Sequence, residues 1–110
     1  MAQDIYVSAH AHAPEAGQKD GAALPMGSPA EVRRVLDAVL PGISWSGGAL
    51  GTWNADDASL LIDVGEDDPC MCVALKQRGA SDEVDRALDA MEARGWYAYL
   101  AIFGVWRHRL

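Results

Sequence analysis

Cysteine is scarce in this sequence of 110 residues, which contains only Cys70 and Cys72. Two cysteines at positions i and i+2 would have to close a strained ring to form a disulfide, so we expect two reduced thiols. A chain of this length can bury a core without disulfides or a bound metal ion. We therefore expect one α+β domain spanning residues 1–110, with no cofactor, in a reducing compartment such as the cytoplasm.

Basic residues are also few, because 9 lysines and arginines stand against 16 aspartates and glutamates, for a formal net charge of −7. Nonspecific nucleic-acid binding needs clustered Lys and Arg to displace counterions from phosphates. The beginning of the chain has an acid at Asp4 and no basic region leading into a long apolar run, so we expect neither a signal peptide nor a transmembrane helix. These absences argue against nucleic-acid and membrane partners and favour a cytoplasmic protein.

Motifs that would identify an enzyme are missing. No serine lies in a Gly-x-Ser-x-Gly context, and residues 47–51, GGALG, lack the Lys-Ser or Lys-Thr pair and the following helix of a phosphate-binding loop. Cys70 or Cys72 could act with His10, but neither cysteine lies at a predicted helix start, where the helix dipole would lower its pKa. We assign no catalytic residue and keep a small thiol-dependent enzyme as a second alternative.

Two segments have the pattern of amphipathic helices. In residues 28–42, Ser28 can cap the helix, Pro29 suits its first position, and Glu31 completes a capping box. In residues 81–95, Ser81 is the expected cap. The apolar stripes that would face a core are Val32, Val35, Leu36, Val39 and Leu40 in the first helix, and Val84, Ala87, Leu88 and Met91 in the second.

Alternating patterns predict strands at residues 4–10, 43–53, 58–65 and 70–79, and a largely apolar last strand at 96–106. Residues 11–28 are rich in Ala, Gly and Pro without periodicity, which predicts a long mobile loop. The order is strand, helix, three strands, helix, strand. Two single-striped helices would both cover one face of a single sheet, so we predict a two-layer α+β sandwich with a mostly antiparallel five-stranded sheet, in which a ferredoxin-like core with an added strand is the closest common layout.

The alternation also assigns the two faces of the sheet, because the larger aliphatic side chains of a half-buried strand face the core. In the last strand both sets of alternating positions are apolar, so this strand adds either Tyr97 and Tyr99 or Trp96 to the open face. The expected core side chains are Ile5, Val7, Leu60, Ile62, Val64, Met71, Val73 and Leu75. The expected open-face side chains are Tyr6, His10, His12, Leu61, Asp63, Cys70, Cys72 and Lys76.

The four potential metal ligands on that face are His10, His12, Cys70 and Cys72. They would converge only if the first and fourth predicted strands are neighbours, and a single Cys-x-Cys with a single His-x-His lacks the paired spacings of zinc motifs. We favour reduced strand cysteines and loop histidines, since Cys commonly behaves as a small hydrophobe. A small-ligand or metal-binding domain that uses these four residues remains the first alternative.

Acidic residues are concentrated in the two turns between the middle strands. No Lys or Arg occurs between Asn54 and Leu75, so this stretch could form an electrostatic docking surface for a basic partner, although acids are also common in solvated turns. The acids are Asp56, Asp57, Asp63, Glu66, Asp67 and Asp68.

Tryptophan supplies a further candidate for the interface. We expect Trp45 and Trp96 to fill the core and Trp106, near the basic C-terminal residues, to be exposed or buried in a dimer. In size and charge the chain resembles the small acidic α+β proteins that bacteria use as immunity or accessory proteins. The sequence thus leads us to expect a small cytoplasmic binding protein that docks a basic protein through its acidic turns, with homodimerisation through the open face as a further expectation.

Overall fold

The computed structural model describes residues 2–16 and 23–110 and shows an α+β arrangement of two helices and one antiparallel sheet of eight strands. The helices are α1 (Pro29–Val39) and α2 (Asp82–Ala93), and a short 3-10 helix, η1 (Arg107–Arg109), ends the chain. The strands are β1 (Ala2–His10), β2 (Ala23–Leu24), β3 (Ser44–Ser46), β4 (Leu50–Asn54), β5 (Ala58–Asp63), β6 (Val73–Gly79), β7 (Trp96–Leu100) and β8 (Val105–Trp106).

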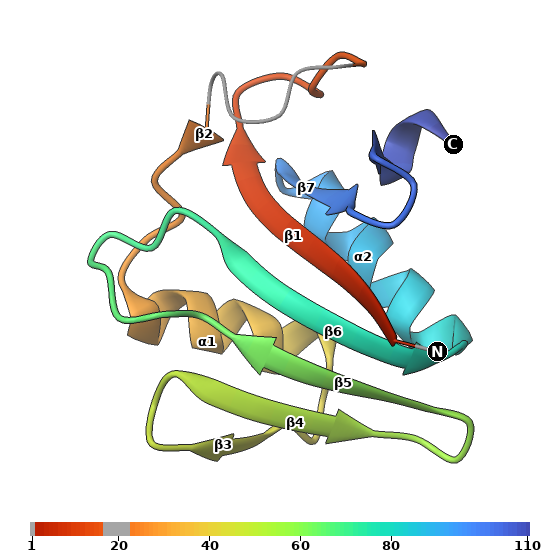
Figure 1. Ribbon diagram of the computed structural model, residues 1–110. Helices are drawn as coiled ribbons and strands as arrows, with labels where there is room; N and C mark the ends of the chain where they lie inside the picture. The colour runs from red at the N-terminus through yellow and green to blue at the C-terminus, as the bar shows by residue number, and fades with distance from the viewer. Residues whose placement is uncertain (1, 17–22) are drawn as a thin grey trace.

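The sheet has the order β3-β4-β5-β6-β1-β7-β8, with β2 paired to the end of β1. The first strand of the chain therefore lies inside the sheet, between β6 and β7. Figure 1 shows α1 and α2 on one face of the sheet, so the other face carries no α-helix in the described part of the chain. None of the helices in the described ranges is long and apolar enough to cross a membrane.

The sheet has more strands than the five that the sequence predicted. Residues 43–53 form the hairpin of β3 and β4 instead of the single predicted strand, because Gly47 and Gly48 adopt φ of 67° and 91° and turn the chain back. Residues 96–106 likewise divide into β7 and β8. The predicted loop at 11–28 contributes β2, while residues 17–22 of that loop lie outside the described residues.

Both predicted helices are confirmed, together with their N-terminal caps. The amide of Glu31 donates to Ser28 Oγ at 3.2 Å and the amide of Ser28 donates to Glu31 Oε1 at 3.0 Å, which completes the capping box of α1. Ser81 Oγ accepts from the amide of Glu83 at the start of α2. The predicted stripe of α2, Val84, Ala87, Leu88 and Met91, is buried throughout.

The core lies between the helices and the face of the sheet that the alternation predicted. Trp96 is buried as expected, and Trp45 packs against the core while its indole donates to Asp37 Oδ1 at 2.9 Å. Seven of the eight predicted core side chains from the strands are no more than 2% exposed: Ile5, Val7, Leu60, Ile62, Val64, Val73 and Leu75.

The assignment of faces is wrong at Cys70 and Met71. Cys70, expected on the open face, is 1% exposed, and Met71, expected in the core, is 40% exposed. The reason is that β6 begins only at Val73, whereas Cys70 pairs with Gly27 through an isolated bridge outside the regular strands. Strict alternation holds only along a continuous extended strand, so the pattern could not be extended back from Val73 to Cys70.

Candidate functional site

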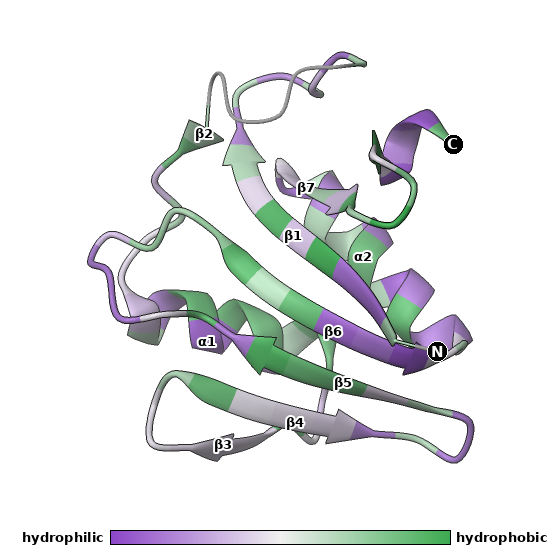
Figure 2. Ribbon diagram, viewed as in Figure 1, coloured by the Kyte–Doolittle hydropathy of each residue, from purple (hydrophilic) through white to green (hydrophobic). Residues whose placement is uncertain are grey.

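The open face of the sheet carries a row of side chains that are neighbours from strand to strand. Side chains of one row share a face because facing residues in an antiparallel pair project to the same side. We call these residues the cross-strand row: Leu50 (β4), Asp63 (β5), Ala74 (β6), Tyr6 (β1), Tyr99 (β7) and Trp106 (β8). Asp63 is its only charged member. Figure 2 shows that hydrophobic residues fill much of β5 and the first half of β6, and that the second half of β6 is hydrophilic.

A pocket of about 370 Å³ lies at the aromatic end of the row. It is formed mainly by β1, by the residues just before β6 and by the C-terminal strands. Its walls are Tyr6, Ser8, Ala23, Met71, Cys72, Tyr99 and Trp106. None of these seven side chains is acidic or basic, and most of the wall is apolar, as is usual for sites that bind small organic molecules.

His10 adds a buried polar group behind the pocket. Its side chain follows Ser8 on the same face of β1, and Ser8 Oγ lies 2.8 Å from His10 Nε2. Although the sequence placed His10 on the open face, it is only 6% exposed because Trp106 covers it edge-on, with ring centroids 5.3 Å apart. Burial, and then the neighbouring His108, lower the pKa of His10 below its ordinary value.

Trp106 is not the exposed ring that the sequence predicted. It is 2% exposed and packs edge-on against Tyr99 as well as His10, with a ring-centroid distance of 5.2 Å to Tyr99. The residue that follows it explains this position: Arg107 Nη1 donates to Asp89 Oδ1 at 2.8 Å and to Glu92 Oε1 at 3.1 Å, both on α2. Trp106 therefore contributes to the wall of the pocket and not to a projecting contact.

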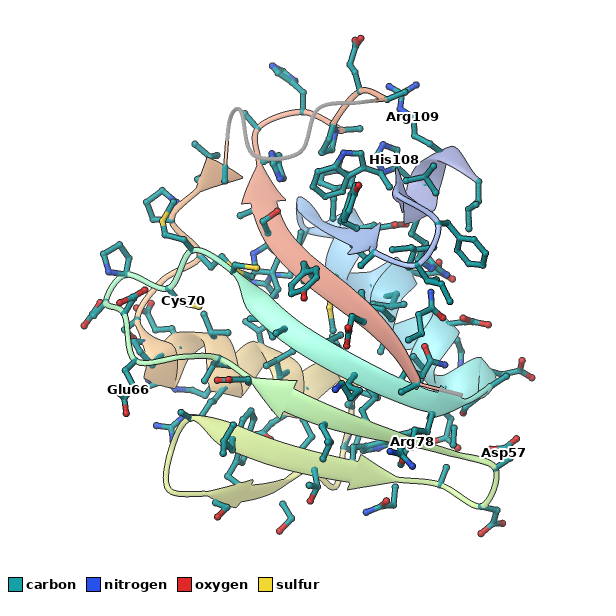
Figure 3. All side chains as sticks on the ribbon, viewed as in Figure 1. Asp57, Glu66, Cys70, Arg78, His108 and Arg109 are labelled. Carbon is teal, nitrogen blue, oxygen red and sulfur yellow. The ribbon has the colours of Figure 1, made fainter. Side chains whose placement is uncertain are left out.

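The C-terminal residues also hold the segment that follows β1. His108 Nε2 lies 2.9 Å from the carbonyl oxygen of Pro14, and Arg109 Nε donates to the same oxygen at 3.0 Å. Figure 3 shows His108 and Arg109 at one end of the sheet, where β1 ends. The aromatic side of the pocket is thus fixed by contacts to α2 and to the segment after β1.

The four potential metal ligands do not share one side of the sheet. β1 and β6 are neighbours, as convergence required, but Cys70 points into the core and its thiol donates to the carbonyl of Val64 at 3.3 Å. Burial raises the pKa of Cys70. Cys72 and His12 are exposed. Across residues 2–16 and 23–110, no cluster of three or more His, Cys, Asp or Glu side chains could hold a metal ion.

The six acids divide into two groups instead of one continuous edge. Consecutive hairpins of an antiparallel meander lie at opposite ends of the sheet, and Figure 3 shows Asp57 and Glu66 at opposite ends. Asp56 and Asp57 share a shallow hollow with Arg78, which offsets part of their charge. The remaining acids, Asp63, Glu66, Asp67 and Asp68, lie at the other end.

This second group of acids adjoins exposed apolar side chains. Leu50 and Leu61 are each 54% exposed and line a hollow of about 190 Å³ on the open face. The charged side chains of this hollow are Asp63 and the ion pair of Lys76 with Asp4. We call Leu50, Leu61, Asp63, Glu66, Asp67 and Asp68 the leucine–acid surface.

Part of the pocket wall was not predicted from the sequence. The alternation placed Tyr6 and Cys72 on the open face and offered Tyr99 as one of two alternatives, but it assigned Met71 to the core and did not indicate Ser8 or Ala23. Alternation along β1 could have placed Ser8 on the same face as Tyr6. Ala23, in contrast, reaches the pocket only because β2 pairs with β1. No family model matches the chain, and no curated protein or solved structure is significantly similar to it.

Proposed function

We propose that this protein is a small binding protein that docks a basic protein partner on the leucine–acid surface. The observation that carries the proposal is the exposure of Leu50 and Leu61, at 54% each, on the face that neither α1 nor α2 covers, directly beside Asp63. The acids Glu66, Asp67 and Asp68 follow in the next connection, and the sequence has no Lys or Arg between Asn54 and Leu75. Apolar side chains beside charged ones are the composition of a protein interface.

The charge of the surface selects the kind of partner. A segment with Lys or Arg near apolar side chains could bury the two leucines while its cations meet the acids, and the opposite charges would accelerate the encounter. A second copy of this chain would instead bring the same acids to the interface, and like charges there are unfavourable. We therefore favour a basic partner over the homodimer, with Asp56 and Asp57 contributing only to the long-range field.

The scaffold that presents this surface is, in our proposal, a two-layer variant of the ferredoxin-like arrangement in a cytoplasmic protein. Its support is the order β5-β6-β1-β7 with all pairs antiparallel, in which β6 separates β1 from β5 and β1 separates β6 from β7. This is the strand order of a split β-α-β unit. The hairpin of β3 and β4 then extends the sheet on the side of the leucine–acid surface.

Matched charge reversals test the docking proposal. The partner that wild-type protein retains is identified by capture at low salt, and its Kd is then measured at about 50 mM and about 300 mM salt. We expect the double variant Glu66→Lys and Asp67→Lys to raise the Kd at low salt about 10-fold or more and to weaken its salt dependence. The control, Asp56→Lys with Asp57→Lys, makes the same change of charge at the other end of the sheet and should change the Kd less than about 3-fold.

The apolar part of the surface is tested separately. Leu61→Ser should weaken binding at both salt concentrations, because it removes apolar contact without changing charge. Equal effects of the two charge reversals, or no effect of Leu61→Ser, would contradict docking at the leucine–acid surface. If the wild-type protein forms a concentration-dependent dimer and Leu61→Ser dissociates it, the partner on this surface is a second copy of the chain and not a basic protein.

A further inference from the structure

The pocket at the aromatic end of the cross-strand row has the size and wall of a small-molecule site. Its volume of about 370 Å³ lies within the range of about 300–1,000 Å³ typical of such sites. It is separate from the leucine–acid surface except at Tyr6, which lines both hollows. An inference from this pocket therefore does not depend on the docking proposal.

Three aromatic side chains line the pocket, and two of them contact each other. Tyr6 and Tyr99 are cross-strand partners, and Tyr99 and Trp106 are the next pair along the row. Tyr99 and Trp106 meet at an interplanar angle of 74°, an edge-to-face contact that fixes both rings. Opposite them, the flexible thioether of Met71 can adapt to the shape of a bound ring.

The polar groups of the pocket are neutral. Ser8 Oγ lies 2.8 Å from His10 Nε2, so this pair can offer a hydroxyl to a ligand while the imidazole stays beneath it. His10 lies against Trp106 and Tyr97, with ring centroids 5.3 Å and 6.2 Å away, and this apolar contact disfavours the charged imidazolium. Cys72 stands at the exposed rim of the pocket.

From these features we infer that the pocket binds an uncharged aromatic small molecule, with its ring against Tyr6 and Tyr99 and a hydroxyl or similar group at Ser8. Among the described residues of the wall, an anion would find no basic side chain and a cation no carboxylate. A cation could be held by aromatic faces alone, as in aromatic cages. Trp106, however, is 2% exposed and offers the pocket too little of its ring face for such a cage.

Three probes that share a naphthalene ring test the charge preference. They are 2-naphthalenemethanol, which is uncharged, 2-naphthoate and 2-naphthylmethylammonium, each titrated into the full chain and followed by calorimetry and by the NMR amide shifts of residues around Ser8 and Cys72. We expect a Kd of about 0.1–2 mM for the alcohol, given its small number of atoms. Both charged probes should bind at least about 10-fold more weakly, since neither charge is compensated in the pocket.

Variants locate the site. Cys72→Phe should fill the mouth of the pocket and weaken binding of the alcohol about 10-fold or more. Thr52→Phe, an equally large change at an exposed residue outside the pocket wall, should leave the Kd unchanged. Ser8→Ala should weaken the binding of the alcohol but not the binding of 2-methylnaphthalene, which lacks the hydroxyl. The last comparison needs only one small substitution and decides the proposal even if Cys72→Phe lowers stability.

Several outcomes would overturn the inference. One is failure of the alcohol to bind at concentrations up to about 5 mM, and another is tighter binding of the ammonium or carboxylate probe. The others concern the variants: an equal loss of affinity for the alcohol and for 2-methylnaphthalene in Ser8→Ala, or a loss of affinity for the alcohol in Thr52→Phe. Binding of the alcohol that is blocked by Cys72→Phe and weakened selectively by Ser8→Ala would support it.

Discussion

Cys70 and Cys72 lie two positions apart in environments that give their thiols different properties. Cys70 is 1% exposed and its thiol meets the carbonyl of Val64, whereas Cys72 is exposed at the pocket rim. Burial raises the pKa of Cys70, and only thiolates react readily with disulfide reagents. The Cys-x-Cys spacing thus joins one buried, structural cysteine to one accessible cysteine.

The first prediction follows from this difference. Titration of the native protein with a disulfide reagent should modify Cys72 and leave Cys70 unmodified until denaturant is added. Cys70→Ala should lower the free energy of unfolding by about 1–3 kcal/mol, because it leaves a small cavity in the core, while Cys72→Ala should change it by less than about 0.5 kcal/mol. Denaturant unfolding of both variants measures the difference. Equally rapid modification of both native thiols would contradict the burial of Cys70.

Two glycines at the ends of the central hairpins allow backbone strain to be separated from steric contact. Gly79, the last residue of β6, has φ of 75°, and a Cβ at this position would collide with the carbonyl oxygen of Asp57. Gly65 has nearly the same φ, 70°, but a Cβ there would meet nothing within 4 Å. Both positions disfavour a side chain through φ, yet only Gly79 has no room for one.

We therefore expect Gly79→Ala to lower the free energy of unfolding more than Gly65→Ala does. The free energy of unfolding should fall by about 1 kcal/mol for Gly65→Ala, from the positive φ alone, and by about 2–4 kcal/mol for Gly79→Ala, where backbone must also move. Equilibrium urea unfolding of the two variants checks the order. Equal losses would show that the close approach of Gly79 to Asp57 is relieved at little cost.

At the level of elements, the sequence predicted what depends on local pattern. Both helices and their serine caps follow from residues within one or two turns, and the core faces of β1, β5 and β6 follow from alternation along single strands. The hairpin of β3 and β4 was missed because the alternation over residues 43–53 predicted one strand, although two successive glycines, Gly47 and Gly48, are also a turn signal.

The candidate pocket could be predicted only in part, because it is built from pairings between distant segments. Tyr6 and Ser8 follow from the parity of β1, but their proximity to Trp106 requires β7 to lie beside β1 and the chain to turn back into β8. The burial of Trp106 further depends on Arg107 reaching Asp89 and Glu92 on α2. No spacing in the sequence indicates these contacts.

In the whole molecule, the C-terminal residues connect the two faces of the sheet. Trp106 covers His10 on the face without helices, and the next residue, Arg107, binds the carboxylates of α2. His108 and Arg109 then meet the carbonyl of Pro14 after β1. These contacts exclude water from His10, so protonation of this one imidazole is coupled to the stability of the entire fold.

This coupling gives the stability of the protein a dependence on pH around neutrality. Burial and the neighbouring His108 lower the pKa of folded His10 below 6.5, the ordinary value that the unfolded chain retains. As the pH falls through 6.5, His10 therefore becomes protonated in the unfolded state while it stays neutral in the folded state. The free energy of unfolding decreases as a result, until the pH drops below the pKa of His10 in the folded protein. Above 6.5 both states are neutral at His10, and this residue contributes no further change.

His10→Gln isolates this contribution, since glutamine does not titrate and can still hydrogen bond to Ser8. Urea unfolding at pH of about 7.5 and about 5.5 should show that wild-type protein loses more free energy of unfolding on acidification than His10→Gln does. Both proteins retain His12 and His108, so the difference between them arises from the substitution at His10. If the two proteins lose the same free energy between these pH values, His10 is protonated equally easily in the folded and unfolded states, and the cover provided by Trp106 does not exclude water from it.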